Sequence, residues 1–424
     1  MEGRSSRIGR RRLALLFALV LLSGGGGSLA WPANRPQRGR DEEIGSLLTR
    51  RGAAVNARDR GAFLASIDSG ATGFVETQGT WFDRMGALPI LDYSLESEVE
   101  SLGELTRAAD RRRYGSPVVV AQVQERFRIQ GFDDHPASSD HYYTFVKRAE
   151  GWRIASDSDL SDLGLLSARQ PWDFGPIQLF SSDHFLLVVH PDEVRFAPEL
   201  LRLAEEALPT VDRVWRRPWS KRVLIFVPSS PEELEGLLNA TFDVSNFVAF
   251  ASASLDREAG WRFTGARIIL NRANFLRHTP SSRREIFAHE LAHVATREAS
   301  GPFVPVFVEE AMAELASADL DISFLEARAR SGGFDRRLPG DPELLSGDGQ
   351  AIYLSYQEAL SVALFVRDRF GVETFNRLYE ALGAARVEAG TRKYHLNRVL
   401  TETLGMSLAN FEREWGSYVA GRAG

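Results

Sequence analysis

The segment IFAHELAHV, residues 286–294, decides how the second half of this 424-residue chain folds. Its apolar residues lie on several sides of a helical projection, which predicts a buried α-helix. His289 and His293 are one turn apart on such a helix, so both imidazoles can reach the same ion. Glu290 lies about 100° further round, beside that ion. Two imidazoles and a carboxylate are costly to bury alone, which favours a bound cation.

A second segment, PVFVEEAMAE at residues 305–314, predicts the helix that completes this group. Pro305 suits the first helical position. Glu310 and Glu314 are one turn apart and therefore share a face of the helix. This spacing suits Glu310 as a third metal ligand and Glu314 as the acceptor that orients a ligating imidazole through its other N–H group. Glu309 is the alternative third ligand.

The two segments together resemble the gluzincin pattern of the peptidase-MA clan of zinc metallopeptidases. The motif H-E-x-x-H is followed, after sixteen residues, by Glu310 within the phrase FVEEAMA. In gluzincins this phrase is commonly Trp-Leu-x-Glu-Gly-x-Ala, and Ala311 stands here where glycine is usual. The alignment selects Glu310 over Glu309, which is then expected to be a solvated charge. The resemblance spans about residues 180–420.

The resemblance implies zinc-dependent hydrolysis of peptide bonds in a peptide or protein substrate. Zn²⁺ would be held by His289, His293 and Glu310, and it would lower the pKa of a bound water toward about 7. Glu290 would act as the general base that accepts a proton from this water and passes it to the leaving amine.

In related enzymes a tyrosine on the helix after the zinc site hydrogen-bonds the tetrahedral oxyanion. Tyr356 aligns best with that tyrosine, and Tyr353 and His395 are the alternatives. The Gly-x-Met-Glu-Asn phrase of the zinc aminopeptidases is missing, and the sequence GARIILN at residues 265–271 occupies the comparable strand. The missing glutamate favours an endopeptidase over an aminopeptidase. We expect this strand to offer its edge to an extended substrate backbone.

Composition and charge exclude several other kinds of site. The chain has 51 basic and 57 acidic residues, and the net charge of −6 argues against a general nucleic-acid binder. It contains no cysteine, which excludes disulfides, thiolate nucleophiles, cysteine zinc sites and iron–sulfur clusters. Histidine, aspartate and glutamate remain as the strong metal ligands.

The first 30 residues have the features of an export signal. Three arginines, Arg10–Arg12, precede an apolar run over residues 13–22, which is shorter than the roughly 20 residues of a spanning helix. Small residues precede a predicted cleavage after Ala30. No other segment is apolar enough to span a bilayer, so we expect an exported protein. An uncleaved signal would instead anchor it to the membrane.

Residues 41–168 predict a separate accessory domain. A helical pattern comes first, and the predicted strands that follow are Val118–Ile129, His141–Val146 and Gly151–Ala155. This order suggests a curved antiparallel sheet wrapped over helices. With the closing phrases YYTFVKR and GWRI, it resembles the nuclear-transport-factor-2-like (SnoaL-like) cone. We interpret His135 and His141 as surface or turn histidines near the strand ends and assign them no catalysis.

The expected fold class is α+β, because strands come first and helices later. The predicted organisation is a signal peptide at residues 1–30, a linker at 31–40, the cone-shaped accessory domain at 41–168 and a gluzincin-like peptidase domain with a mostly helical carboxy-terminal part at 169–424. The competing hypothesis is a non-catalytic exported binding protein that acts through the accessory domain. The intact Glu290 argues against it, since a purely structural zinc site needs no base beside its ligands.

Overall fold

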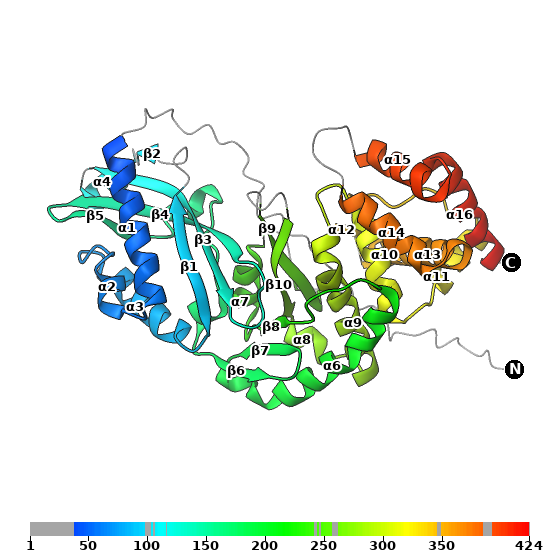
Figure 1. The fold of residues 1–424 in the computed structure, drawn as a ribbon, viewed down its shortest axis with the longest axis horizontal. Helices are drawn as coiled ribbons and strands as arrows, with labels where there is room; N and C mark the ends of the chain where they lie inside the picture. Colours follow the sequence, from blue (N-terminus) through cyan, green and yellow to red (C-terminus); the bar gives the residue numbers. More distant parts are fainter. Residues whose placement is uncertain are drawn as a thin grey trace, which may run out of the picture.

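The computed structural model describes residues 38–97, 103–104, 107–115, 117–240, 244–245, 247–256, 262–345, 349–384 and 392–423. The predicted signal and most of the predicted linker lie outside these residues. In the part of the chain that is described, no helix is long and apolar enough to cross a membrane. The architecture is α+β, as the sequence predicts, with two sheets followed by a helical carboxy-terminal part (Figure 1).

The amino-terminal half is a curled antiparallel sheet with helices packed on it (Figure 1). Its strands run in the order β1–β3–β4–β5, and β2 pairs with β3. The strands are β1 Ile90–Ser97, β2 Gly103–Glu104, β3 Val118–Ile129, β4 Ala137–Arg148 and β5 Gly151–Ser156. The helices are α1 Arg38–Asn56, α2 Arg60–Leu64, α3 Thr72–Met85 and α4 Ala108–Tyr114. The predicted curved sheet over helices is confirmed.

Alternation along β3 explains how this sheet is covered. Val119, Ala121 and Val123 belong to the main hydrophobic core, together with apolar residues of α1. Val118 and Val120 join a smaller cluster. Because successive side chains of a strand point to opposite faces, both faces of β3 are buried near its start.

His141 lies on the core side of β4, so its interpretation as a surface or turn histidine is wrong. Its side chain is buried, and its Nε2 lies 3.3 Å from Oε2 of Glu125. Glu125 also accepts hydrogen bonds from the hydroxyl of Tyr93 at 2.6 Å and from that of Ser139 at 3.1 Å. His135 is exposed, as expected.

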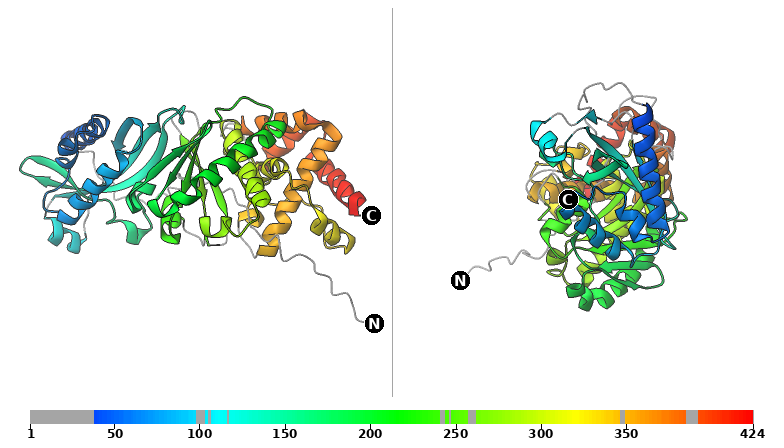
Figure 2. Two further views of the ribbon diagram at one scale, coloured as in Figure 1. Left: turned by 90° about the horizontal axis from the view of Figure 1, so that it is seen from below. Right: turned by 90° about the vertical axis from the view of Figure 1, so that its left-hand side faces the viewer.

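The second sheet lies between the first sheet and the carboxy-terminal helices, and the three parts follow one another along the molecule (Figure 2). Its strands are β6 Gln178–Ser181, β7 Phe185–Val189, β8 Val223–Val227, β9 Ala249–Asp256 and β10 Arg262–Leu270, in the order β6–β7–β8–β10–β9. Strands β7, β8 and β10 are parallel, and β6 and β9 are antiparallel to their neighbours. The strand at residues 265–271 is therefore an inner strand. The expectation that it offers an edge to substrate is wrong, because β9 covers it.

Twelve helices of the described residues belong to the junction and the second half. They are α5 Pro171–Phe174, α6 Ala197–Val214, α7 Pro231–Leu238, α8 Arg272–Phe275, α9 Pro280–Thr296, α10 Val306–Ser317, α11 Ser323–Arg330, α12 Asp341–Leu345, α13 Gly349–Phe370, α14 Val372–Gly383, α15 Arg392–Leu404 and α16 Leu408–Ala423. Short 3₁₀ turns lie at Ser161–Leu163, Pro191–Phe196 and Arg297–Ala299. Helix α6 packs on β7 and on α9, and α9 in turn packs on α10.

The two halves touch where β4 meets β9 and β10. Arg267 of β10 donates two hydrogen bonds, at 2.6 and 2.7 Å, to the carboxylate of Asp133, and both side chains are buried. Gly265 has a φ of +62°, and a Cβ at this position would lie 2.3 Å from the Cβ of Ala137. Only glycine satisfies both conditions. The division into domains at 41–168 and 169–424 stays a prediction.

Candidate metal centre

Helix α9 begins at a cap that its sequence supplies. Thr279 accepts a hydrogen bond from the N–H of Ser282 at 3.2 Å, and Pro280 takes the first helical position. From Ile286 to Thr296 every side chain except that of Val294 is buried. The helix lies against α6, α10, β9 and β10, which explains why it is apolar on several sides.

Three side chains of α9 and α10 converge at the spacing of metal ligands. The Nε2 atoms of His289 and His293 are 3.2 Å apart, and Oε2 of Glu310 lies 3.3 Å from the first and 3.7 Å from the second. Ligand atoms about 2.1 Å from a tetrahedral ion are about 3.4 Å from one another. All three residues are at most 1% exposed. This buried group can hold a metal ion.

Glu314 and Tyr356 adjoin the group. Oε1 of Glu314 lies 3.1 Å from Nδ1 of His289, the ring nitrogen that does not face the other ligands. The ring of Tyr356, from α13, stacks on that of His289 with centroids 6.2 Å apart. Burial raises the pKa of Tyr356 well above its ordinary value, and the charges of Glu310, Glu314 and Glu290 raise it further. The tyrosine is therefore a neutral hydrogen-bond donor beside the centre.

Glu290 is buried, and neither carboxylate oxygen makes a hydrogen bond of normal geometry, although a backbone group of Ala251 in β9 acts to lower its pKa. Burial raises its pKa to about 8, although the charge of His289 lowers it. A buried carboxylate without a partner is rare in folded proteins, because each unpaired atom has lost its water. Both oxygens remain available to a molecule bound at the centre.

The protein's own charges make the centre attractive to a cation. Burial lowers the pKa of His293 to about 4, so this ring is neutral and able to ligate at pH 7. Burial also opposes a charge on His289, but the neighbouring carboxylates of Glu310 and Glu314 raise its pKa to about 10. Burial would raise the pKa of Glu310, but the two imidazoles lower it to about 2. A proton and a metal ion therefore compete for the same group.

Glu309 is buried, so the expectation that it is a solvated charge is wrong. It is 5% exposed and accepts a hydrogen bond from the hydroxyl of Ser300. Ser300 is also 2.9 Å from the hydroxyl of Tyr379, which donates to Thr296 at 3.1 Å. The neighbouring Glu310 is the residue that α10 turns toward the two histidines.

The two alternatives to Tyr356 lie in other surroundings. The hydroxyl of Tyr353 accepts a hydrogen bond from Gln357 at 2.8 Å, and its ring packs against Phe324. His395 packs against Phe303, and neither of its ring nitrogens has a hydrogen-bond partner. Of the three candidates, Tyr356 is the one whose ring contacts a ligand of the centre.

Arg297 is a neighbour of the centre that the sequence analysis did not single out. It is 3% exposed, its Nη2 donates to the carbonyl of Ala251 in β9 at 3.2 Å, and its guanidinium lies 5.2 Å from the ring centroid of Phe263. Its positive charge acts to lower the pKa of Glu290. Arg297 follows His293 by four residues, which is also the spacing between the two histidines. This spacing is the sequence feature that could have indicated Arg297 as a neighbour of the centre.

No protein-family model and no curated protein matches this chain. The fold and the site define the chain as an α+β protein with a buried His289–His293–Glu310 group that can hold a metal ion.

Proposed function

We propose that this protein is an exported zinc-dependent peptidase of the gluzincin type. The observation that carries the proposal is the convergence of His289, His293 and Glu310 beside the unpartnered carboxylate of Glu290. A structural zinc site is closed by four protein ligands, whereas a catalytic site has three and keeps a position for water or substrate. Three ligands with a free carboxylate beside them match the second kind.

The donor set suits zinc. Two imidazole nitrogens and one carboxylate oxygen are ligands that zinc commonly has in hydrolases. Oε2 of Glu310 and both oxygens of Glu290 have no hydrogen-bond partner, and such buried atoms are costly unless a cation is close. When bound, zinc would lower the pKa of a coordinated water and polarise the scissile carbonyl.

The residues around the ion then have separate tasks. We propose that Glu290 accepts a proton from the attacking water and returns it to the leaving amine, and that the charge of the bound ion keeps it ionised. The hydroxyl of Tyr356 donates a hydrogen bond to the oxyanion. Oε1 of Glu314, 3.1 Å from Nδ1 of His289, is close enough to accept the Nδ1–H and so to hold Nε2 toward the ion.

The outer edge of β9 is proposed to align the peptide. Asn271 donates its N–H to the carbonyl of Val248 at 2.9 Å, and in this register Ala249 and Ala251 direct their backbone groups away from β10. Ala251 lies beside the centre, since its carbonyl accepts the hydrogen bond from Arg297. An extended peptide can add through main-chain hydrogen bonds to the part of this edge that is not taken by Arg297 or covered by β4. A bound peptide backbone would thereby pass close to Glu290.

The test is cleavage of an unbiased peptide library by the mature protein and by Glu290→Gln. We expect zinc in both proteins, and cleavage about 10²–10⁴-fold slower in the variant, because it lacks the proton acceptor. Equal cleavage by the two proteins would contradict the role of Glu290. Zinc without any cleavage by the wild type would support the binding-protein hypothesis, and a protein that binds no zinc would overturn the proposal.

A further inference from the structure

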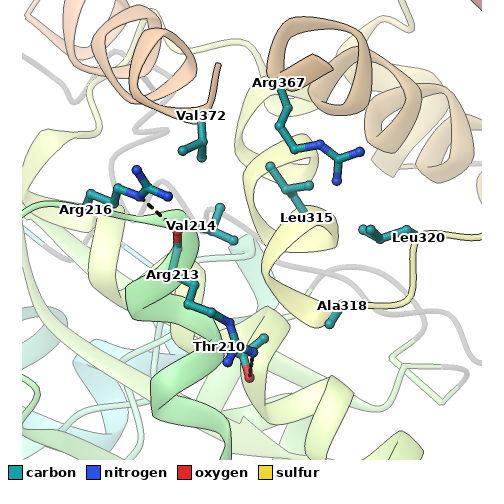
Figure 3. A pocket seen from close by; sticks show the side chains of 9 residues that line it. All are labelled: Thr210, Arg213, Val214, Arg216, Leu315, Ala318, Leu320, Arg367 and Val372. Atoms are coloured by element: carbon teal, nitrogen blue, oxygen red, sulfur yellow. Dashed lines mark hydrogen bonds between the residues drawn. The ribbon is translucent and has the colours of Figure 1, made fainter.

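A cavity of about 320 Å³ lies away from the metal centre, between α6, the end of α10 and the junction of α13 with α14 (Figure 3). This volume is at the lower end of the range for small-molecule sites. None of its lining residues belongs to the metal centre. The cavity therefore calls for an occupant of its own.

The cavity has an apolar floor. Val214, Leu315 and Val372 line it together with Leu320, which is 38% exposed. In Figure 3, Leu315 and Val214 lie between Arg216 on one side and Arg367 on the other. The apolar surface can hold a short hydrocarbon group, and burying it would stabilise the complex.

Two arginines at the cavity have no acidic partner among the residues that the structure describes. Among the described residues, no carboxylate lies within ion-pair distance of Arg213 or Arg216. Arg213 donates to the hydroxyl of Thr210 at 3.3 Å, and Nε of Arg216 donates to the carbonyl of Arg213 at 3.2 Å. Both side chains are exposed, so they remain free to bind an anion.

The acids nearby are occupied by other cations. Glu373, on whose pKa the charge of Arg216 acts, pairs with Arg217 at 2.8 Å. The third arginine of the cavity, Arg367, pairs with Asp368 at 2.7 Å. Arg213 and Arg216 therefore form no ion pair with either of these acids.

Helix α14 begins at the same cavity. Its first residue, Val372, lines the cavity, and the preceding Gly371 has no side chain to accept hydrogen bonds from the first-turn amides. Helices α6, α10 and α13 end at the same place, so the positive end of the α14 dipole is offset by their negative ends. The guanidiniums of Arg213 and Arg216 thus lie at the cavity beside its apolar floor.

We propose that this cavity binds a small aliphatic carboxylate. The carboxylate would lie against Arg213 and Arg216, because the planar guanidinium matches a carboxylate with two parallel hydrogen bonds. The hydrocarbon would lie on Val214 and Leu315. A fully hydrated inorganic anion would make no apolar contact with Val214 and Leu315, and a neutral alcohol would leave the arginines unpaired.

The experiment is calorimetric titration of the full mature chain with hexanoate. We expect saturable binding of hexanoate at one site per chain. Hexan-1-ol and acetate should each bind at least about tenfold more weakly, because the first lacks the carboxylate and the second lacks the hydrocarbon chain. Inorganic phosphate that binds as tightly as hexanoate, or hexanoate that does not saturate, would overturn the proposal.

Variants locate the site. The double variant Arg213→Gln/Arg216→Gln should weaken hexanoate at least about tenfold and remove its advantage over hexan-1-ol. Leu320→Asn should weaken hexanoate without changing acetate, because it reduces the apolar wall alone. Arg112→Gln, a change at an exposed arginine of α4, is the matched control and should change neither. Unchanged zinc content shows that each variant is folded. Hexanoate binding that none of these cavity variants alters would place the ligand elsewhere and refute the assignment.

Discussion

Each half of the molecule contains a buried histidine–carboxylate group, and the two groups differ in how many of their polar atoms are paired. In the amino-terminal half, Glu125 accepts hydrogen bonds from Tyr93 and Ser139 and lies against His141. At the metal centre, both oxygens of Glu290 have no hydrogen-bond partner, and neither does Oε2 of Glu310. The two groups have similar burial and similar residue types.

From this difference we infer that buried polar atoms without a hydrogen-bond partner indicate a functional site better than a buried histidine does. A fully paired polar network stabilises a unique core, whereas a partly paired one is expensive to bury. A bound cation would compensate the unpaired carboxylate oxygens of the metal centre, whereas Glu125 needs no such cation. Burial raises the pKa of Glu125, but His141 and the hydroxyl donors lower it below its ordinary value. We therefore expect the first group to support folding and the second to support chemistry.

The largest contrast is expected in the rate of peptide cleavage. Glu290→Gln should lower kcat by about 10²–10⁴-fold because the general base is lost. Glu125→Gln should leave kcat unchanged, because this carboxylate contacts no part of the metal centre. Both are measured on folded protein with equal zinc content. A folded Glu125→Gln protein that loses activity would show that the comparison is drawn between the wrong groups.

The second largest difference between the two histidine–carboxylate groups is expected in their effect on metal content. The purified mature protein is expected to hold about one zinc ion per chain, and His293→Ala should lose most of it because only two protein ligands remain. His141→Ala should retain the ion. Elemental analysis after gel filtration in metal-free buffer gives the measurement. Zinc loss in His141→Ala, with the fold intact, would contradict the assignment.

Two adjacent glutamates of α10 allow a finer test of the centre. Glu310→Gln replaces an anionic ligand by a neutral one and should weaken zinc at least about tenfold. Glu309→Gln should leave zinc affinity unchanged, since its side chain bonds to Ser300 instead. Competition with a chromogenic chelator measures both. The reverse result would make Glu309 the ligand.

The free energy of unfolding is expected to fall when Glu125 loses one of its hydrogen-bond donors. Tyr93→Phe removes the hydroxyl that donates to Glu125, and one buried carboxylate oxygen is then unpaired. The free energy of unfolding should fall by about 1–3 kcal/mol, as measured by urea titration. Zinc content should not change, and a loss of zinc would show that the two halves are more strongly coupled than the contacts indicate.

The smallest effect is expected in the pH dependence of stability at a third histidine–carboxylate pair. His190 lies 2.7 Å from Glu233 and 2.9 Å from the carbonyl of Pro176, both of which are acceptors, so the doubly protonated ring fits best. The hydrogen bond with Glu233 raises the pKa of His190, and burial opposes it. A raised folded-state pKa contributes stability below the unfolded value of about 6.5 that is lost as pH rises through the folded value.

The melting temperature of the wild type should therefore fall further between pH 6.5 and a more alkaline pH than that of His190→Gln. Differential scanning calorimetry of the two proteins across this range is the measurement. Parallel curves would show that His190 has the same pKa in the folded and unfolded chain.

The parts of the fold and site that follow from local geometry could be predicted from the sequence. The spacing of His289 and His293 places both on one helix face whatever surrounds the helix. Strand β3 has the predicted bounds Val118–Ile129, because a run of alternating and branched residues is a local signal. Glu310 and Tyr356 needed the family resemblance as well, since their approach to the histidines depends on how three helices pack.

The errors all concern contacts that a residue's own helix or strand does not reveal. Glu309 is a charged residue in an ordinary helical phrase, and its burial depends on Ser300 and on Tyr379 of α14. His141 is buried because Glu125 faces it across the β3–β4 pair. The strand at residues 265–271 is internal because β9 precedes it in the chain and pairs with it. Neither the identity of a partner nor strand order is encoded in a residue's own neighbourhood.

The Asp133–Arg267 pair has a consequence for the order in which the chain is made. The two residues are separated by 134 positions, so the amino-terminal half leaves the ribosome well before β10. At about 5–20 residues per second this interval lasts roughly 7–27 s. During that time Asp133 lacks its cation, and Ala137 lacks the glycine surface that will cover it. The nascent amino-terminal half thus exposes Asp133 and Ala137 until β10 has been synthesised.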